Sequence, residues 1–223
     1  MSTGQLRVAG PPEDFPVSRL SGPGLRWIVW LQGCSLRCTR QCLNPELLDP
    51  AGGVVVSQEA MEAVLEGLTA KHAELEGVTF LGGEPFDQAA ALAPLAAAIR
   101  RRGLSVMTYT GWVFEDLLER GPAGSRELLA ATDLLLDGPF LPERHSTNLL
   151  WCGSDNQRLL LLSDRYRREN LQERAIVKGI DARFDGGHVQ ITGAQDRTLL
   201  QDILRSLRSH GFAVQAEAAR GGD

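Results

Sequence analysis

Apolar runs and helical patterns alternate along most of the chain. Runs that are apolar throughout, as in strands buried on both faces, occupy residues 25–31, 77–83, 104–111 and 133–138. Helical periodicity occupies 57–72 and 87–103, followed by the shorter stretches FEDLLER and SRELLAAT. Because buried strands alternate with helices, the pattern predicts a parallel sheet that is covered by helices.

The two longer helical patterns carry recognisable end signals. Ser57 is a predicted N-cap, and Gly103 closes the second helix. Pro94 lies inside the second pattern and is expected to kink that helix or to mark its true start. Three basic residues, Arg100–Arg102, complement the helix dipole at its end. We interpret them as a solvated helix end rather than a nucleic-acid contact.

The two ends of the chain are less regular. The first 24 residues form a leader rich in Gly and Pro, with one short strand expected around Leu6–Ala9. Residues 158–163 and 174–180 are candidates for further strands. Near the C-terminus, FDGGHVQITG predicts a β-hairpin over 184–193 around Asp185-Gly186-Gly187, and an amphipathic helix is predicted over 196–211.

These elements predict an α/β fold, a partial (β/α) barrel of mostly parallel strands covered by helices, with a C-terminal β-hairpin and helix. The chain has 223 residues, which is short for a complete eight-stranded barrel of about 250 residues. We expect a leader over 1–24 and one domain over 25–223, with its core at 25–180 and the hairpin and helix at 181–223. In a partial barrel or an open sheet, the ligand site lies at the carboxyl ends of the strands.

Composition excludes some classes of partner. The net charge of -5 offers no general attraction for nucleic acid or for an acidic membrane surface. No apolar run approaches the roughly 18 residues needed to span a bilayer. The N-terminus lacks the basic and then apolar pattern of a signal sequence. The expected location is therefore the cytoplasm, where thiols stay reduced.

Three of the four cysteines lie in one short stretch, LQGCSLRCTRQCLNP, as Cys34, Cys38 and Cys42. Clustered cysteines in a reducing compartment indicate metal or redox chemistry, and in so tight a loop they make poor structural disulfides. A structural zinc site needs four ligands, and the fourth would have to come from Cys152 or a distant histidine. An iron-sulfur cluster is the better match, because thiolates are its natural ligands.

A second motif, LGGEPFDQ, follows the next predicted strand, and on its own it could be a simple turn between strand and helix. After the cysteine loop, it resembles the cofactor-binding motif of the radical S-adenosylmethionine superfamily. The resemblance implies that Cys34, Cys38 and Cys42 hold a 4Fe-4S cluster whose open iron is chelated by S-adenosylmethionine. The turn that binds the cofactor's amino group would comprise Gly82, Gly83, Glu84 and Pro85.

Further segments are similar to the subgroup that activates glycyl-radical enzymes, most of all the activases of anaerobic ribonucleotide reductase. They are VMTYTGW, DLLLDGPF and GSDNQRLL, and the resemblance covers roughly residues 25–163. It implies polar contacts from Thr110 and Asp137 to the cofactor's carboxylate or ribose, and Asn44 also matches the subgroup. The implied partners are a glycyl-radical enzyme and a one-electron donor such as flavodoxin or ferredoxin.

The cysteine spacing departs from the superfamily pattern. The common spacing is C-x3-C-x2-C, often with an aromatic residue before the third cysteine, whereas this chain has C-x3-C-x3-C with Gln41 there. An extra loop residue is tolerable for cluster binding, but it shifts backbone near the adenine and removes a stacking group. Two alternatives therefore stay open: a radical enzyme that modifies a peptide or small molecule, and a non-enzymatic iron-sulfur electron carrier or zinc-binding protein.

Cys152, the remaining cysteine, has two interpretations. A free cysteine is commonly a small buried hydrophobe, and the alternative is a thiol on the substrate side of the site. A role as fourth cluster ligand would block the position of the cofactor. The four histidines are interpreted as structural or surface residues.

Overall fold

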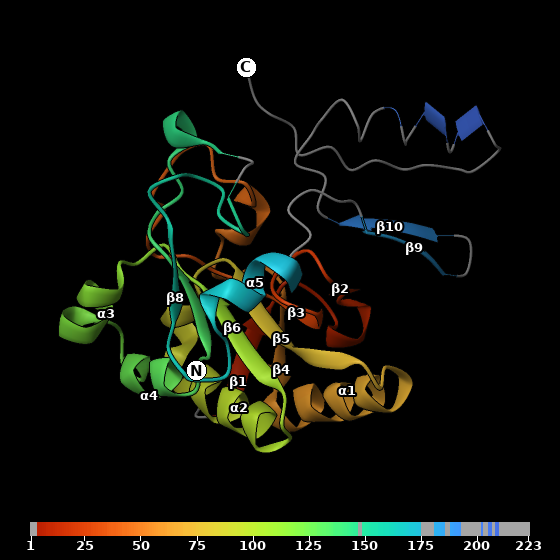
Figure 1. Cartoon of the computed structure of the whole chain (residues 1–223), viewed down its shortest axis with the longest axis horizontal. Coiled ribbons are helices and arrows are strands. Elements are labelled where there is room, and N and C mark those ends of the chain that lie inside the picture. The colour runs from red at the N-terminus through yellow and green to blue at the C-terminus, as the bar shows by residue number, and fades with distance from the viewer. Residues whose placement is uncertain are drawn as a thin grey trace. The chain divides into compact units, whose positions relative to one another are not determined.

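The structure is a computed structural model that describes residues 4–146, 149–174, 181–185 and 188–192, together with 202, 205, 206, 208 and 209. The chain divides into two compact units, Met1–Val177 and Lys178–Asp223. Figure 1 labels most of the helices and strands of both units, which are described separately below.

The first unit is built on an eight-stranded sheet with the order β4-β1-β3-β5-β6-β7-β8, in which β2 also pairs with β3. Four parallel strands form its centre: β3 (Leu25–Leu31), β5 (Leu75–Gly82), β6 (Ser105–Tyr109) and β7 (Leu134–Asp137). Their registers place Trp27 opposite Val78, and Val78 opposite Val106. Each strand falls within or close to a predicted apolar run, so the predicted parallel core is confirmed.

Antiparallel strands complete the sheet on both sides. They are β1 (Gln5–Val8), β2 (Val17–Ser18), β4 (Val54–Ser57) and β8 (Arg158–Leu161). Residues 1–24, predicted as a leader, thus contribute β1 and β2. The sequence analysis missed β4, because this strand runs directly into the N-cap of a helix and exposes Val54 and Val55 at the sheet edge. Since β4 and β8 do not pair with each other, the sheet stays open, as a partial barrel requires.

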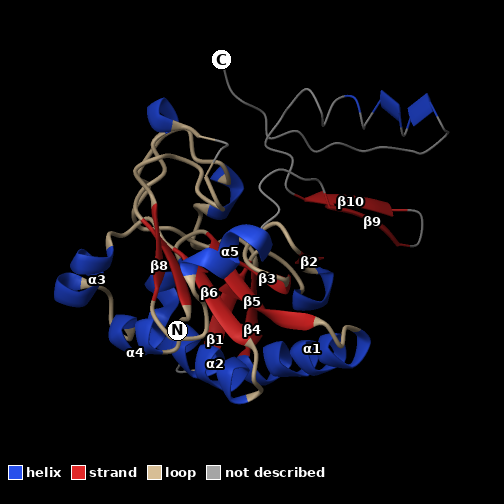
Figure 2. Ribbon diagram, viewed as in Figure 1, coloured by secondary structure: helices blue, strands red, loops and turns tan. Residues whose placement is uncertain are grey.

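Helices cover the sheet. The α-helices are α1 (Gln58–Lys71), α2 (Ala89–Arg101), α3 (Phe114–Arg120), α4 (Ser125–Ala130) and α5 (Arg168–Arg174). Short 3₁₀ helices occupy Pro12–Asp14, Pro45–Leu47, Pro85–Gln88 and Pro142–Arg144. Figure 2 shows α1, α2 and α4 along one side of the sheet. Ser57 caps α1 as predicted, by accepting a hydrogen bond from Ala60 N–H. Pro94 lies inside α2, which begins at Ala89, so it does not mark the start of that helix.

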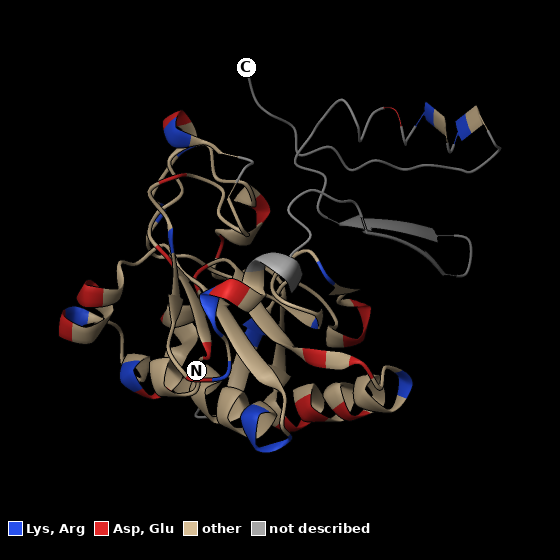
Figure 3. Ribbon diagram, viewed as in Figure 1, with Lys and Arg blue, Asp and Glu red and all other residues tan. Residues whose placement is uncertain are grey.

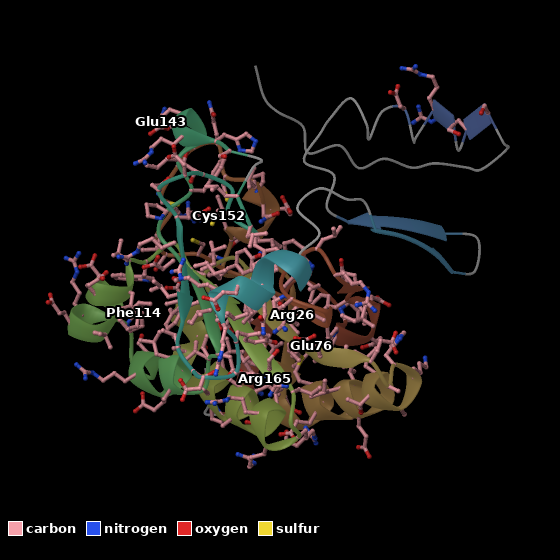
Figure 4. All side chains as sticks on the ribbon, in the orientation of Figure 1. Arg26, Glu76, Phe114, Glu143, Cys152 and Arg165 are labelled. Atoms are coloured by element: carbon pink, nitrogen blue, oxygen red, sulfur yellow. The ribbon has the colours of Figure 1, made fainter. Side chains whose placement is uncertain are left out.

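A buried arginine ties the amino ends of the parallel strands together. Arg26 is fully buried and donates hydrogen bonds of 2.7 Å to Thr79 Oγ1, Ser105 Oγ and the Val78 carbonyl oxygen. Tyr166 joins this group, because its hydroxyl donates to Ser105 Oγ at 2.7 Å. Figure 4 shows Arg26 beside Glu76, whereas Cys152, on a loop, and Glu143, in the 3₁₀ helix Pro142–Arg144, lie toward the other end of the unit. A buried charge needs such partners, since leaving it unpaired is strongly destabilising.

Most other charged side chains lie on helices and loops (Figure 3). Two of the three arginines at the end of α2 form ion pairs inside the chain, Arg100 with Asp133 at 3.4 Å and Arg102 with Glu62 at 3.0 Å. These pairs give the basic run a role within the fold. Within the part of the chain that the structure describes, no helix has both the length and the apolarity needed to cross a membrane.

The second unit contains the predicted hairpin. Strands β9 (Asp181–Asp185) and β10 (His188–Thr192) are antiparallel, with Asp185 opposite His188. Of the candidate strand at 174–180, Arg174 is instead the last residue of α5, and 175–180 lie outside the described residues. Of the helix predicted over 196–211, the structure describes residues 202, 205, 206, 208 and 209, which are helical, and the rest lie outside the described residues. The predicted domain limits stay a prediction.

Candidate functional site

The predicted site residues gather at the carboxyl ends of the four parallel strands, where open α/β sheets bind ligands. The cysteine loop leaves β3 after Leu31, and the Gly-Gly-Glu-Pro turn leaves β5 at Gly82. Thr110 directly follows β6, and Asp137 ends β7. Parallel pairing brings these four strand ends to one edge of the sheet.

The three loop cysteines are free thiols. Cys34 and Cys42 are half-buried, whereas Cys38 is exposed. Burial raises the pKa of Cys34 and of Cys38, and the negative charge of Glu84 raises both further. Since metals and clusters bind thiolates, loading this loop must release protons.

Cys38 lies against the loops that follow β6 and β7. Its sulfur is 3.9 Å from the position that a Cβ atom would take on Gly111. A hydrogen bond from the backbone N–H of Phe140 lowers the pKa of Cys38, although burial outweighs it. The thiol therefore faces the centre of the strand-end edge, which the Gly-Gly-Glu-Pro turn also borders.

The loop supplies the ligand type that iron-sulfur clusters use. In the described residues, no group of three or more His, Cys, Asp or Glu side chains is placed to hold a metal ion. A structural zinc ion needs four ligands. A 4Fe-4S cluster binds thiolates, and the loop offers three free cysteines.

The Gly-Gly-Glu-Pro turn lies directly along the start of the cysteine loop. Gly83 N–H donates to the Leu31 carbonyl at 2.8 Å, and Glu84 N–H donates to the Gly33 carbonyl at the same distance. A Cβ atom on Gly83 would sit 2.1 Å from the Gly33 oxygen, far inside van der Waals contact. Glycine is therefore required here by the close approach of two backbones.

Glu84 turns its carboxylate into the protein. One oxygen accepts hydrogen bonds from Phe86 N–H at 2.9 Å and from the Thr110 hydroxyl at 2.8 Å. The other oxygen accepts from Gly111 N–H at 2.9 Å. The side chain thus ties the turn after β5 to the residues after β6. Burial raises the pKa of Glu84 to about 7, although these three donors oppose the shift.

The raised pKa of Glu84 predicts a pH-dependent stability. The carboxyl titrates near 4.5 in the unfolded chain and near 7 in the folded one, so the folded state binds its proton more tightly. Its contribution to stability is complete below about pH 4.5 and is lost as the pH rises to about 7. We expect Glu84→Gln to remove this part of the pH dependence of the urea midpoint of the metal-free chain. Parallel midpoint curves for the two proteins between pH 5 and pH 8 would contradict the assignment.

Asp137 is buried and already engaged by the protein. Its carboxylate accepts hydrogen bonds from Phe114 N–H at 2.8 Å and from Arg158 Nε at 3.0 Å, and a second Arg158 nitrogen forms an ion pair with it. Glu115 binds the same guanidinium at 2.7 Å. A contact between Asp137 and a cofactor stays a prediction.

The remaining candidates are placed as follows. The Thr110 hydroxyl accepts a hydrogen bond from Trp112 N–H at 3.1 Å, besides donating to Glu84. Asn44 precedes a 3₁₀ helix, and its carbonyl accepts from Leu47 N–H at 3.1 Å. Cys152 is buried among apolar residues that include Met107, and burial raises the pKa of its thiol to about 11. This apolar environment agrees with the interpretation of Cys152 as a small buried hydrophobic residue.

Several residues that shape this edge were missed by the sequence analysis. Gly111 donates its N–H to Glu84 and lies beside the Cys38 sulfur. The Gly33 carbonyl accepts the hydrogen bond from Glu84 N–H. Asp87 binds Ser35, the residue after the first cysteine. All three of Asp87, Ser35 and Gly111 lie within the motifs LGGEPFDQ, LQGCSLRCTRQCLNP and VMTYTGW, but their contacts could not be inferred from those motifs.

Comparison with known proteins gives a consistent assignment. The family model of the 4Fe-4S single cluster domain matches residues 20–160. An anaerobic ribonucleoside-triphosphate reductase-activating protein from Haemophilus influenzae is 25% identical over 147 residues, which cover 64% of this chain and 92% of that protein. The protein of the same name from enterobacteria phage T4 is 26% identical over 149 residues (65% and 89%). That from Vibrio cholerae is 27% identical over 147 residues (64% and 92%).

Proposed function

This chain belongs to the family of 4Fe-4S single cluster domain proteins, and we propose that it is a radical S-adenosylmethionine enzyme that generates a glycyl radical on a partner reductase. The relatives named above are reductase-activating proteins. Their similarity and the cysteine loop support the assignment of an enzyme with a bound iron-sulfur cluster.

The observation that carries the proposal is the junction between the cysteine loop and the Gly-Gly-Glu-Pro turn. The backbone bond from Glu84 to Gly33 places a glycine-rich turn beside the first cysteine. An electron carrier or a zinc protein needs cysteines but has no use for such a turn. An enzyme that must hold a second, amino-bearing cofactor against its cluster needs both.

The residues of the site have the following proposed roles. Cys34, Cys38 and Cys42 hold the cluster as thiolates, and Gly82 to Pro85 present the turn to the amino group of S-adenosylmethionine. When bound, the cluster would supply the one electron for reductive cleavage of S-adenosylmethionine, and the cleaved cofactor would supply the hydrogen-abstracting chemistry. Glu84 holds the turn after β6 in place through Thr110 and Gly111.

The partner we assign is a protein, an anaerobic ribonucleoside-triphosphate reductase whose glycine Cα–H bond is the target. The similarity to reductase-activating proteins supports this choice of partner. An external one-electron carrier, such as flavodoxin or ferredoxin, must also reach the cluster. Free thiols and such carriers suit the cytoplasm.

The proposal is tested by anaerobic reconstitution of the full chain, followed by reduction with S-adenosylmethionine present. We expect 5′-deoxyadenosine to form and the electron paramagnetic resonance (EPR) spectrum of the reduced cluster to change when the cofactor binds. With a partner reductase added, a glycyl-radical signal should appear. The assignment fails if no 5′-deoxyadenosine forms and the cluster spectrum ignores the cofactor.

The same experiment separates the nearest alternative. An enzyme that modifies a peptide or a small molecule would cleave S-adenosylmethionine but produce no glycyl radical on any anaerobic reductase offered to it. The altered cysteine spacing is the feature that keeps this alternative in view.

A further inference from the structure

Two residues just beyond the Gly-Gly-Glu-Pro turn, Asp87 and Gln88, contact the cysteine loop on both flanks of Cys34. Neither belongs to the predicted set of site residues. They end the 3₁₀ helix Pro85–Gln88, which leads into α2. Rigid elements of this kind position a site more accurately than loops do.

Asp87 holds the residue that follows Cys34. One carboxylate oxygen accepts a hydrogen bond of 2.6 Å from Ser35 N–H, and the other accepts one of 2.6 Å from the Ser35 hydroxyl. Charge-assisted bonds of this length are the stronger kind. Two such bonds to one residue fix both the position and the orientation of the peptide that joins Cys34 to Ser35.

Gln88 holds the other flank. Its side-chain amide donates to the carbonyl oxygens of Gln32 at 3.1 Å and of Arg7 at 2.9 Å, and its amide oxygen accepts from Arg7 N–H at 2.7 Å. Gln32 in turn donates through its side chain to the carbonyls of Glu46 at 3.1 Å and Asp49 at 2.8 Å. The start and the end of the cysteine loop therefore meet at Gln32.

We propose that Asp87 and Gln88 are positioning residues that bracket Gly33–Cys34 and make Cys34 the fixed ligand of the cluster. The inference rests on the proposed function, since it presumes that the loop holds a cluster. The contacts of Asp87 and Gln88 on either side of Gly33–Cys34 are called the bracket, and the Glu84 bond to Gly33 lies between them. The element that carries the Gly-Gly-Glu-Pro turn therefore also positions the first cysteine. This fixes the cluster site and the cofactor site relative to each other.

The remainder of the loop has no support from this 3₁₀ helix, and Cys38 instead meets Phe140 N–H after β7. Among the described residues, 36–43 form no hydrogen bond to the 3₁₀ helix, and Gln41 N–H bonds within the loop to Thr39 Oγ1 at 3.1 Å. Cys38 and Cys42 can adjust to the cluster once Cys34 is set. The extra residue of the C-x3-C-x3-C spacing lies between these two cysteines, outside the bracket, where added length is accommodated.

The test compares cluster retention in Asp87→Ala and Gln88→Ala with two controls on α1. Glu62→Ala removes an acid that pairs with Arg102 at 3.0 Å, and Gln58→Ala removes an amide that donates to Glu62 at 2.8 Å. Each reconstituted full chain is challenged anaerobically with an iron chelator, and iron loss is followed by absorbance. Supporting residues around a metal site typically change its affinity by roughly 10–100-fold. We expect each bracket variant to lose iron about tenfold faster than wild type, and each control to match wild type.

A conservative variant separates positioning from charge and from general destabilisation. Asp87→Asn can still accept from Ser35 N–H, and its amide can donate to the Ser35 hydroxyl, so it should restore near wild-type retention. The urea midpoints of the metal-free Asp87→Ala and Asp87→Asn chains should stay close to that of wild type, because Asp87 is exposed.

Three results would overturn the bracket. They are iron loss that matches the controls, an Asp87→Asn variant as labile as Asp87→Ala, and lowered urea midpoints that account for the faster loss. A wild-type chain that takes up no cluster would overturn the proposed function together with the bracket. If the wild type binds a cluster and the Asp87 and Gln88 variants retain it equally well, only the proposed positioning role is overturned.

Discussion

Replacing Cys38 with alanine is expected to yield a folded chain that holds no stable 4Fe-4S cluster and forms no 5′-deoxyadenosine. Cys38 is exposed and lies beside Gly111 at the strand-end edge, so its removal leaves the core untouched. Loss of a supporting residue alone costs roughly 10–100-fold in metal affinity, and loss of a direct ligand should exceed about 100-fold. Iron and sulfide per chain and product formation after reduction measure the two effects.

Cys152→Ala is the matched control for this experiment. Cys152 is buried against Met107, Leu134 and Tyr166, so its truncation opens a small cavity and costs about 1 kcal/mol of stability. Its cluster content should equal that of wild type. A Cys38→Ala chain that keeps its cluster, or a Cys152→Ala chain that loses it, would reverse the assignment of ligands.

Gly83→Ala is expected to have the second largest effect, because the new Cβ atom would lie 2.1 Å from the Gly33 carbonyl oxygen. That oxygen accepts the hydrogen bond from Glu84 N–H, so relief of the clash must separate the two backbones. Overpacking of this kind costs about 3 kcal/mol. The peptide that moves is the one that leads into Cys34, so cluster content should fall together with the urea midpoint.

Gly67→Ala controls for the loss of a glycine. Gly67 lies within α1, and a Cβ atom there would meet nothing within 4 Å. Alanine in a helix interior should raise stability by about 0.5–1 kcal/mol relative to glycine. If Gly83→Ala were as stable and as rich in iron as wild type, the close approach of the two backbones would not be a requirement of the site.

The central strands could be predicted because burial on both faces leaves a continuous apolar run in the sequence. The edge strand β4 (Val54–Ser57) could not, since its pairing with β1 depends on contacts remote in sequence and its first two valines are exposed. The strand β2 has only two residues and carries no periodicity at all. Strand pairing at an edge is decided by tertiary context more than by local preference.

In the site, too, local motifs could be predicted whereas tertiary contacts could not. The cysteines and the Gly-Gly-Glu-Pro turn have fixed spacing along the chain, so a single sequence reveals them. The contacts of Ser35 with Asp87 and of Glu84 with Gly111 join residues more than 25 positions apart, and no local pattern encodes them. Side-chain direction also escaped prediction: the Glu84 carboxylate points inward to three donors rather than being free in the site.

The buried Arg26 has a consequence for how such a chain can change over generations. Three of its partners, Thr79, Ser105 and the Val78 carbonyl, belong to the strands, and a fourth, the Pro23 carbonyl, precedes β3. None belongs to the loops that hold the candidate site. Strand register and ligand chemistry therefore draw on separate sets of residues. A lineage can lengthen a loop or exchange the residues that face a new substrate while the architecture beneath keeps its means of folding. The irregular cysteine spacing is a variation that such a division of labour permits.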